Sequence, residues 1–163
     1  LFYQKQMPHH MLPGFDLTFM SSCTNVFLIR HPARVIASYA RKMESAELAD
    51  IGFAAQTELF DREANRLGRA PVVIDSFDIR ADPRASLTAL CHAIEISFTD
   101  KMLAWPAGGH AGDGIWARHW YGAVHRSTGF EAAEGPLPQL DGPYAALAEA
   151  AMPFYDSLAR YKI

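Results

Sequence analysis

The sequence predicts an α/β fold of three layers, in which helices cover both faces of a parallel sheet. Three short apolar runs, at residues 1–4, 25–30 and 70–75, have the length and the side chains of buried strands. Stretches with helical spacing separate these runs, and one strand passes into a helix without a linker. This alternation of strand and helix favours parallel pairing of the strands.

The stretch from residue 26 to residue 39 carries the clearest signal. Four apolar residues at 26–29 are followed by Pro32, which suits the first turn of a helix because its missing N–H leaves no bond unmade there. The next residues form an apolar face, Val35, Ile36, Tyr39 and Met43, and a polar face, Arg34, Ser38, Arg41 and Lys42. We therefore expect a strand to run straight into a helix, with Arg30 at the junction.

Two more elements are expected in the first half of the chain. A turn at Pro13 and Gly14 precedes a short helix around residues 17–20. Helical spacing returns over residues 51–67, and Gly68 supplies the C-cap that ends this helix.

The second half of the chain contains a clear signal for the start of a helix. Asp82 is a favourable N-cap, and Pro83 occupies the first helical position after it. Four glycines make residues 107–114 a loop by composition. The last segment, residues 144–161, reads as an amphipathic helix that Pro153 kinks or splits in two.

The chain has 163 residues, of which 50% are hydrophobic, and this suits one domain with a sizeable core. Its formal net charge of −3 disfavours nucleic acid as a partner. Segment 1–43 contains five Lys or Arg and one acidic residue, whereas segment 44–163 contains ten Lys or Arg and seventeen acidic residues. A basic zone within an acidic chain indicates a small anionic ligand.

The sequence also indicates the cellular compartment of the protein. It contains no apolar run of membrane-spanning length and no signal peptide, so we expect no membrane partner. Cys23 and Cys91 lie far apart without metal-ligand spacing. We expect them to be reduced thiols of a cytoplasmic protein, although a disulfide is an open alternative.

The junction at Arg30 is a candidate anion site. A helix N-terminus offers unpaired N–H groups and a partial positive charge, and the Arg30 guanidinium adds a fork of donors. Ser38, eight residues later, can add a hydroxyl. The alternative is that Arg30 lies at the surface and Ser38 bonds to its own backbone.

A family resemblance centres on this junction. The tripeptide Arg-His-Pro at residues 30–32, with Ser38 after it, resembles the 3′-phosphate-binding motif of sulfotransferases. Lys5 precedes the motif by twenty-five residues, which is close to the family's spacing. The segment 116–130 is similar to the C-terminal region of a bacterial sulfotransferase-like group.

The resemblance implies a fold like that of P-loop nucleoside triphosphate hydrolases. It implies transfer of a sulfuryl group from the co-substrate 3′-phosphoadenylyl sulfate to a hydroxyl or amine of a small-molecule acceptor, without a metal. The acceptor and the oligomeric state are not indicated.

The resemblance also implies roles for seven residues. Arg30 and Ser38 would hold the 3′-phosphate, and Lys5 would support the sulfuryl group. His9 or His10 would deprotonate the acceptor, since neutral imidazole can take a proton near pH 7. Arg118 and Arg126 would belong to a segment that closes over the nucleotide. The alternatives are that both histidines lie in a surface turn and that Trp116 and Trp120, near these arginines, anchor a core.

One feature departs from the family. No Gly-rich phosphate loop is present, and Leu1 already lies within an apparent strand. We therefore expect the sequence to be the C-terminal portion of a sulfotransferase-like domain spanning residues 1–163, without its N-terminal strand and loop. Two other hypotheses remain. A P-loop-type small-molecule or nucleotide kinase would need a lysine loop and a Mg²⁺ carboxylate, whereas a non-catalytic nucleotide-binding module would need neither.

Overall fold

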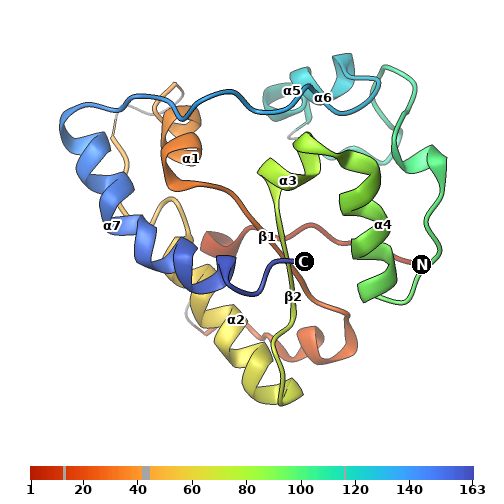
Figure 1. Cartoon of the computed structure of the whole chain (residues 1–163), viewed down its shortest axis with the longest axis horizontal. Helices are drawn as coiled ribbons and strands as arrows, with labels where there is room; N and C mark the ends of the chain where they lie inside the picture. The colour runs from red at the N-terminus through yellow and green to blue at the C-terminus, as the bar shows by residue number, and fades with distance from the viewer. Residues whose placement is uncertain (13, 42–44, 116) are drawn as a thin grey trace. The chain divides into compact units, whose positions relative to one another are not determined.

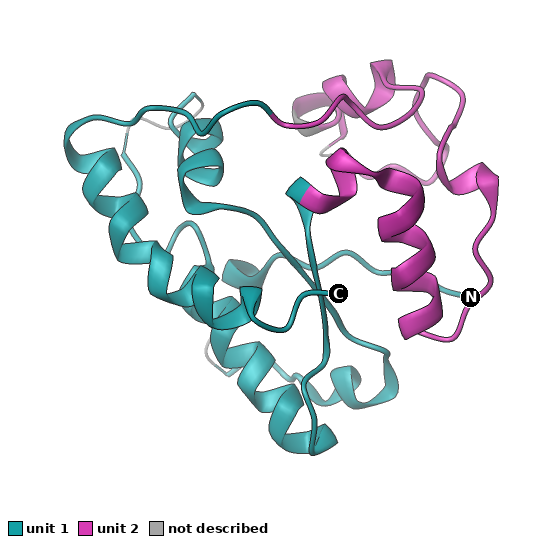
Figure 2. Cartoon of the chain, in the orientation of Figure 1, with its two compact units in different colours: residues 1–77, 135–163 teal, residues 78–134 magenta. Residues whose placement is uncertain are grey.

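A computed structural model describes residues 1–12, 14–41, 45–115 and 117–163. The expectations for Pro13, Lys42, Met43 and Trp116 lie outside the described residues. The chain divides into two compact units (Figure 2). Unit 1 comprises residues 1–77 and 135–163, and unit 2 comprises residues 78–134.

Unit 1 contains the sheet (Figure 1). Its described elements are η1 (Pro8–His10), η2 (Thr18–Ser22), β1 (Val26–Ile29), α1 (Pro32–Tyr39), α2 (Phe53–Leu67), β2 (Val72–Asp75) and α7 (Gly142–Ala159). Helix α7 runs through Pro153 as one helix, so the predicted split does not occur. Pro153 is exposed, and so is Glu149, the residue four positions earlier whose carbonyl loses its N–H partner at a proline.

Unit 2 consists of short helices and loops. Its described elements are α3 (Ser76–Ala81), which begins in unit 1, α4 (Pro83–Ala93), η3 (Asp100–Met102), α5 (Ala117–Trp120) and α6 (Gly122–Arg126). As expected, Asp82 caps α4, because its Oδ1 accepts from the Ala85 N–H at 2.9 Å. The Trp105 Nε1–H donates to Ser127 Oγ at 2.9 Å and joins two loops of this unit.

The two strands pair in parallel, as predicted. Val26 lies opposite Val72 and Ile29 lies opposite Asp75. On the other edge of β2, the Ile163 N–H donates to the Val73 carbonyl at 3.1 Å, and residue 162 forms a parallel bridge with residue 73. Strand β2 therefore has a backbone neighbour along each of its two edges. The three-layer arrangement stays a prediction.

The core of unit 1 lies between one face of the sheet and helices α2 and α7. Phe27 and Val73 project from the strands, Phe60 from α2 and Leu158 from α7. The rings of Phe27 and Phe60 meet edge to face with centroids 5.4 Å apart. This arrangement adds about 0.5–1.5 kcal/mol to the burial of the two rings.

Two strand predictions are wrong in detail. Residues 1–4 form no strand, and Leu1, Phe2 and Tyr3 are exposed. An apolar run becomes a strand only where another segment completes its hydrogen bonds, and none of the segments that the structure describes pairs with residues 1–4. Strand β1 is not buried on both faces, because Val26 and Leu28 are exposed while Phe27 and Ile29 are buried.

The predicted C-cap of α2 is confirmed. Gly68 adopts the left-handed conformation, with φ of 66°. At the other end of α2, Gly52 also has a positive φ of 73°, and a Cβ atom there would lie 3.2 Å from Nδ1 of His9. Glycine therefore allows η1 to approach the start of α2 closely.

We predict that Phe60→Ala lowers the free energy of unfolding by about 3–5 kcal/mol, because it removes a buried ring and leaves a cavity. The measurement is urea unfolding followed by circular dichroism. Phe15→Ala is the control, since Phe15 is 57% exposed and its loss should change stability by at most about 0.5 kcal/mol. Equal shifts for the two variants would contradict the described core.

Candidate functional site

The carboxyl ends of β1 and β2 carry polar side chains. Arg30 and His31 follow β1, and Asp75 is the last residue of β2. Because the two strands are parallel and in register from residue 26 to residue 29, these ends lie at the same edge of the sheet. Open α/β sheets bind their ligands at this edge.

His31 connects the sheet to the first helix. Its Nδ1 accepts from the Ala33 N–H at 3.2 Å and so caps α1. In the neutral ring, the proton then resides on Nε2. Desolvation, with a smaller contribution from the Arg34 charge, lowers the pKa of His31 below its usual value of 6.5, although Asp75 and Asp156 oppose this shift. His31 is therefore a neutral hydrogen-bond donor at pH 7.

Asp75 is buried, with 1% of its surface exposed. Its Oδ1 accepts from the Phe77 N–H at 2.9 Å, and its Oδ2 accepts from the Tyr155 hydroxyl at 2.6 Å. The carboxylate thus joins the end of β2 to the start of α3 and to α7. These bonds give the Asp75 carboxylate a structural role at this edge of the sheet.

Next to Asp75, Ser76 has a buried hydroxyl. Its Oγ has no hydrogen-bond partner among the described residues. An unsatisfied buried hydroxyl costs about 1–3 kcal/mol. A ligand at this edge of the sheet is one way in which that hydroxyl can be satisfied.

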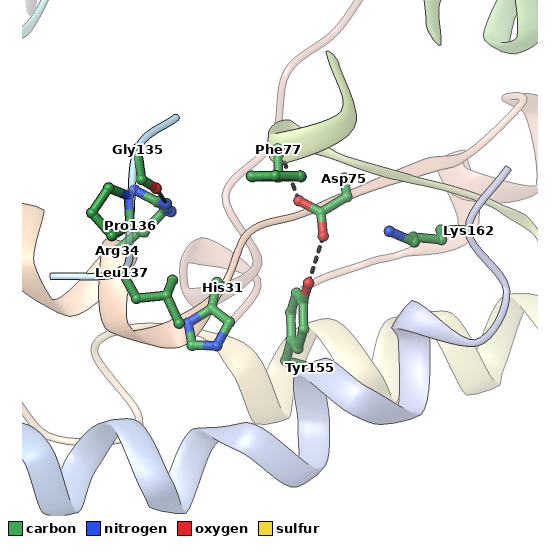
Figure 3. A pocket seen from close by; sticks show the side chains of 9 residues that line it. All are labelled: His31, Arg34, Asp75, Phe77, Gly135, Pro136, Leu137, Tyr155 and Lys162. Carbon is green, nitrogen blue, oxygen red and sulfur yellow. Dashed lines mark hydrogen bonds between the residues drawn. The ribbon is translucent and has the colours of Figure 1, made fainter. Parts of the chain in front are cut away.

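A pocket of about 320 Å³ opens beside His31 and Asp75 (Figure 3). Two cationic side chains, Arg34 and Lys162, line it, and Tyr155 forms part of its wall. A guanidinium nitrogen of Arg34 donates to the carbonyl of Gly135, which fixes the segment that follows unit 2 against α1. Every residue of this pocket belongs to unit 1.

The predicted phosphate ligands lie on the same strand–helix unit. Arg30 directly follows β1 and is half-buried, and its Nε atom is buried. Ser38 is exposed on α1, about two turns from the start of that helix. The strand–helix junction predicted from the sequence is confirmed, whereas the roles of the two side chains stay predictions.

The predicted catalytic residues come from the N-terminal segment. Lys5 is exposed, and His9 and His10 belong to η1, where their ring centroids lie 4.4 Å apart. Desolvation, with a smaller contribution from His10, lowers the pKa of His9 below 6.5, against an opposing effect of Asp50. His9 packs closely against Gly52, whereas His10 is exposed. The structure brings the two histidines together at the start of α2.

Arg118 and Arg126 belong to unit 2. Both are exposed, on α5 and α6 respectively. The Arg118 Nε–H donates to Nε2 of His119 at 3.1 Å. Their contribution to a nucleotide site stays a prediction.

Sequence reasoning missed two groups of residues. Tyr155 and Lys162 line the pocket although they are eighty or more residues from its other polar residues in the chain. In unit 2, His125 Nε2 lies 2.9 Å from Asp113 Oδ2, and hydrogen bonds from the His110 backbone and from His125 lower the pKa of Asp113. No local pattern reveals such pairs.

Cys23 is an exposed free thiol and Cys91 is a buried one. Across the described ranges, no helix has both the length and the apolar character needed to cross a bilayer. The same residues contain no group of three His, Cys, Asp or Glu side chains suited to a metal ion.

The architecture defines an α/β protein with a small parallel sheet and a polar edge at the strand ends. The model of the sulfotransferase domain family matches residues 1–161, so the chain belongs to this family. This confirms the resemblance noted at the Arg-His-Pro motif.

Two curated proteins of Arabidopsis thaliana are similar to this chain. Branched-chain-amino-acid aminotransferase-like protein 1 is 32% identical over 161 residues, which are 96% of this chain and 28% of that protein. Branched-chain-amino-acid aminotransferase-like protein 2 is 30% identical over 154 residues, which are 94% of this chain and 27% of that protein. The chain therefore spans little more than a quarter of either relative. No solved structure gives a significant match.

We predict that His31 makes stability depend on pH. The pKa of His31 is lower in the folded state than in the unfolded state, so the unfolded state binds the proton first as pH falls through 6.5. The free energy of unfolding should therefore decrease between pH 7.5 and pH 5.5.

His31→Asn should reduce this decrease, because asparagine can still cap α1 but does not titrate. Urea unfolding at pH 7.5, 6.5 and 5.5 measures both slopes. Equal slopes in the wild type and the variant would contradict the described surroundings of His31.

Proposed function

We propose that the chain is part of a sulfotransferase that moves a sulfuryl group from 3′-phosphoadenylyl sulfate to a hydroxyl or amine of a small-molecule acceptor. The observation that carries this proposal is the β1–α1 junction in a chain of the sulfotransferase family, with Arg30 at the end of the strand and Ser38 on the helix. The two free thiols fit the reducing cytoplasm, where we place the protein.

In this proposal, the junction holds the 3′-phosphate of the donor. The Arg30 guanidinium supplies a planar fork of donors that matches a phosphate. The Ser38 hydroxyl adds a neutral donor from the same helix. Arg118 and Arg126 would add positive charge from unit 2 when that segment closes over the nucleotide.

The chemical step forms one S–O or S–N bond and breaks another. The acceptor atom attacks sulfur, and the bond between sulfur and the bridging phosphate oxygen breaks, so adenosine 3′,5′-bisphosphate leaves. The acceptor proton passes to His9, whose lowered pKa keeps the ring neutral and able to accept it at pH 7. Lys5 would offset the negative charge that develops on the bridging oxygen.

The first test is calorimetric titration with adenosine 3′,5′-bisphosphate. We predict that Arg30→Ala weakens binding about ten- to a hundredfold, because a lost charge-assisted contact costs about 1.5–3 kcal/mol. Ser38→Ala should weaken it less, because its hydroxyl is neutral. Arg69→Ala is the control, since Arg69 is exposed in the loop between α2 and β2, and it should bind as the wild type does.

Absence of bisphosphate binding to the wild type would refute the proposal. Binding and turnover with Mg-ATP in place of 3′-phosphoadenylyl sulfate would instead favour a kinase. Bisphosphate binding without sulfuryl transfer to any acceptor tested would favour a non-catalytic nucleotide-binding module.

A second prediction separates the two histidines. His9→Asn should reduce kcat about 10²- to 10⁴-fold, the usual contribution of a general base, and leave bisphosphate affinity unchanged. His10→Asn is the matched control and should retain most activity. In the wild type, kcat/KM should fall only as pH drops below 6.5. A larger loss in His10→Asn than in His9→Asn would assign the base to His10.

A further inference from the structure

We propose that Gly52 is a positioning residue for His9. In this proposal Gly52 lets the imidazole lie against the start of α2 with Nδ1 toward that helix, so that Nε2 is the nitrogen that takes the proton of the acceptor. The catalytic part of the inference rests on the proposed function, in which His9 is the general base. The contact between His9 and Gly52 does not, because it is a feature of the structure itself.

The space beside Gly52 is occupied by η1. A Cβ atom built on Gly52 would lie 3.2 Å from Nδ1 of His9, 3.4 Å from its backbone nitrogen and 3.5 Å from its Cβ. Ordinary van der Waals contacts of a Cβ atom measure 3.4–4 Å, so any larger residue would require His9 to move by a few tenths of an ångström. Gly52 therefore determines how closely both the ring and the backbone of His9 approach α2.

The orientation of the His9 ring assigns its two nitrogens. The ring atom nearest to the space beside Gly52 is Nδ1, and the His10 ring meets the His9 ring edge to face, with an interplanar angle of 81°. A neutral imidazole has one nitrogen that accepts a proton and one that carries a proton, so the surroundings of Nδ1 decide which of the two can act as the base. A substrate atom does not fit between Nδ1 and Gly52, and the acceptor hydroxyl would therefore reach Nε2.

The turn that precedes α2 also supplies a charge. Among the described residues, His10 and Asp50 are the charged groups that act on His9. Desolvation and then His10 lower the pKa of His9, whereas the Asp50 carboxylate raises it. That carboxylate is fixed within the turn, because Asp50 Oδ2 accepts from the Glu47 N–H at 2.9 Å. The same turn thus holds the ring at Gly52 and limits the fall of its pKa at Asp50.

The other end of α2 provides a matched control. Gly68 also has a left-handed backbone, with φ of 66° against 73° at Gly52. A Cβ atom at Gly68 would meet nothing within 4 Å. Gly52→Ala and Gly68→Ala therefore introduce similar backbone strain at the two ends of one helix, and only Gly52→Ala introduces a contact with His9.

The first measurement is the pKa of the His9 ring, followed by NMR as the pH of the protein solution is changed. Gly52→Ala should raise this pKa toward 6.5, because the displaced ring loses part of its burial against α2. Gly68→Ala should leave it at the wild-type value. Asp50→Asn should lower it further, because the amide removes the negative charge but can still accept from the Glu47 N–H. An unchanged His9 pKa in Gly52→Ala would overturn the proposal.

The second measurement is sulfuryl transfer from 3′-phosphoadenylyl sulfate, with phenol as the acceptor probe. Gly52→Ala should lower kcat about tenfold, because a small displacement of a catalytic group reduces the rate of the chemical step. Its affinity for adenosine 3′,5′-bisphosphate should not change. The acid limb of kcat/KM should move to higher pH in Gly52→Ala and to lower pH in Asp50→Asn, following the pKa of His9.

The control variant separates positioning from a general loss of structure. Urea unfolding midpoints should fall by similar amounts in Gly52→Ala and Gly68→Ala, while kcat and its pH profile change only in Gly52→Ala. An equal loss of kcat in both variants, or a loss in Gly52→Ala without movement of the acid limb, would overturn the positioning role.

The inference and the proposed function can fail separately. Wild-type kcat and wild-type His9 pKa in an active Gly52→Ala variant would overturn the inference alone. Absence of sulfuryl transfer by the wild type would refute the proposed function and the positioning role with it, whereas the NMR titration would still decide whether Gly52 seats the His9 ring.

Discussion

The buried carboxylate of Asp75 holds together the edge of the sheet on which the site depends. Its two oxygens bind the Tyr155 hydroxyl of α7 and the Phe77 N–H at the start of α3. A charged group with 1% exposure is tolerated only when such donors replace water. The same side chain therefore ends β2, positions α7 and shapes one wall of the pocket.

Local chemistry explains what the sequence predicted correctly. The β1–α1 junction, the Gly68 C-cap and the Asp82 N-cap each depend on residues within one or two turns of one another. Parallel pairing of β1 and β2 followed from the helical segment between them, because such strands need a long crossover. The family resemblance centred on the first of these features, the β1–α1 junction.

What the sequence did not predict depends on distant contacts. Residues 1–4 have the composition of a strand, but strand formation requires a neighbour that composition does not specify. Tyr155 and Lys162 read as ordinary residues of an amphipathic helix and its end, and only the tertiary structure brings them to the carboxyl edge of the sheet. Alternating exposure on β1 likewise depends on which faces other elements cover.

Unit 1 is discontinuous along the chain, and this has a consequence for its synthesis. Phe27, Phe60 and Val73 leave the ribosome well before Leu158, which completes their core. At about 5–20 residues per second, the 85 residues that are added from Val73 to Leu158 take about 4–17 s to translate. During that interval the apolar side chains of the nascent chain lack the partner that completes their core, and they stay accessible to other apolar surfaces.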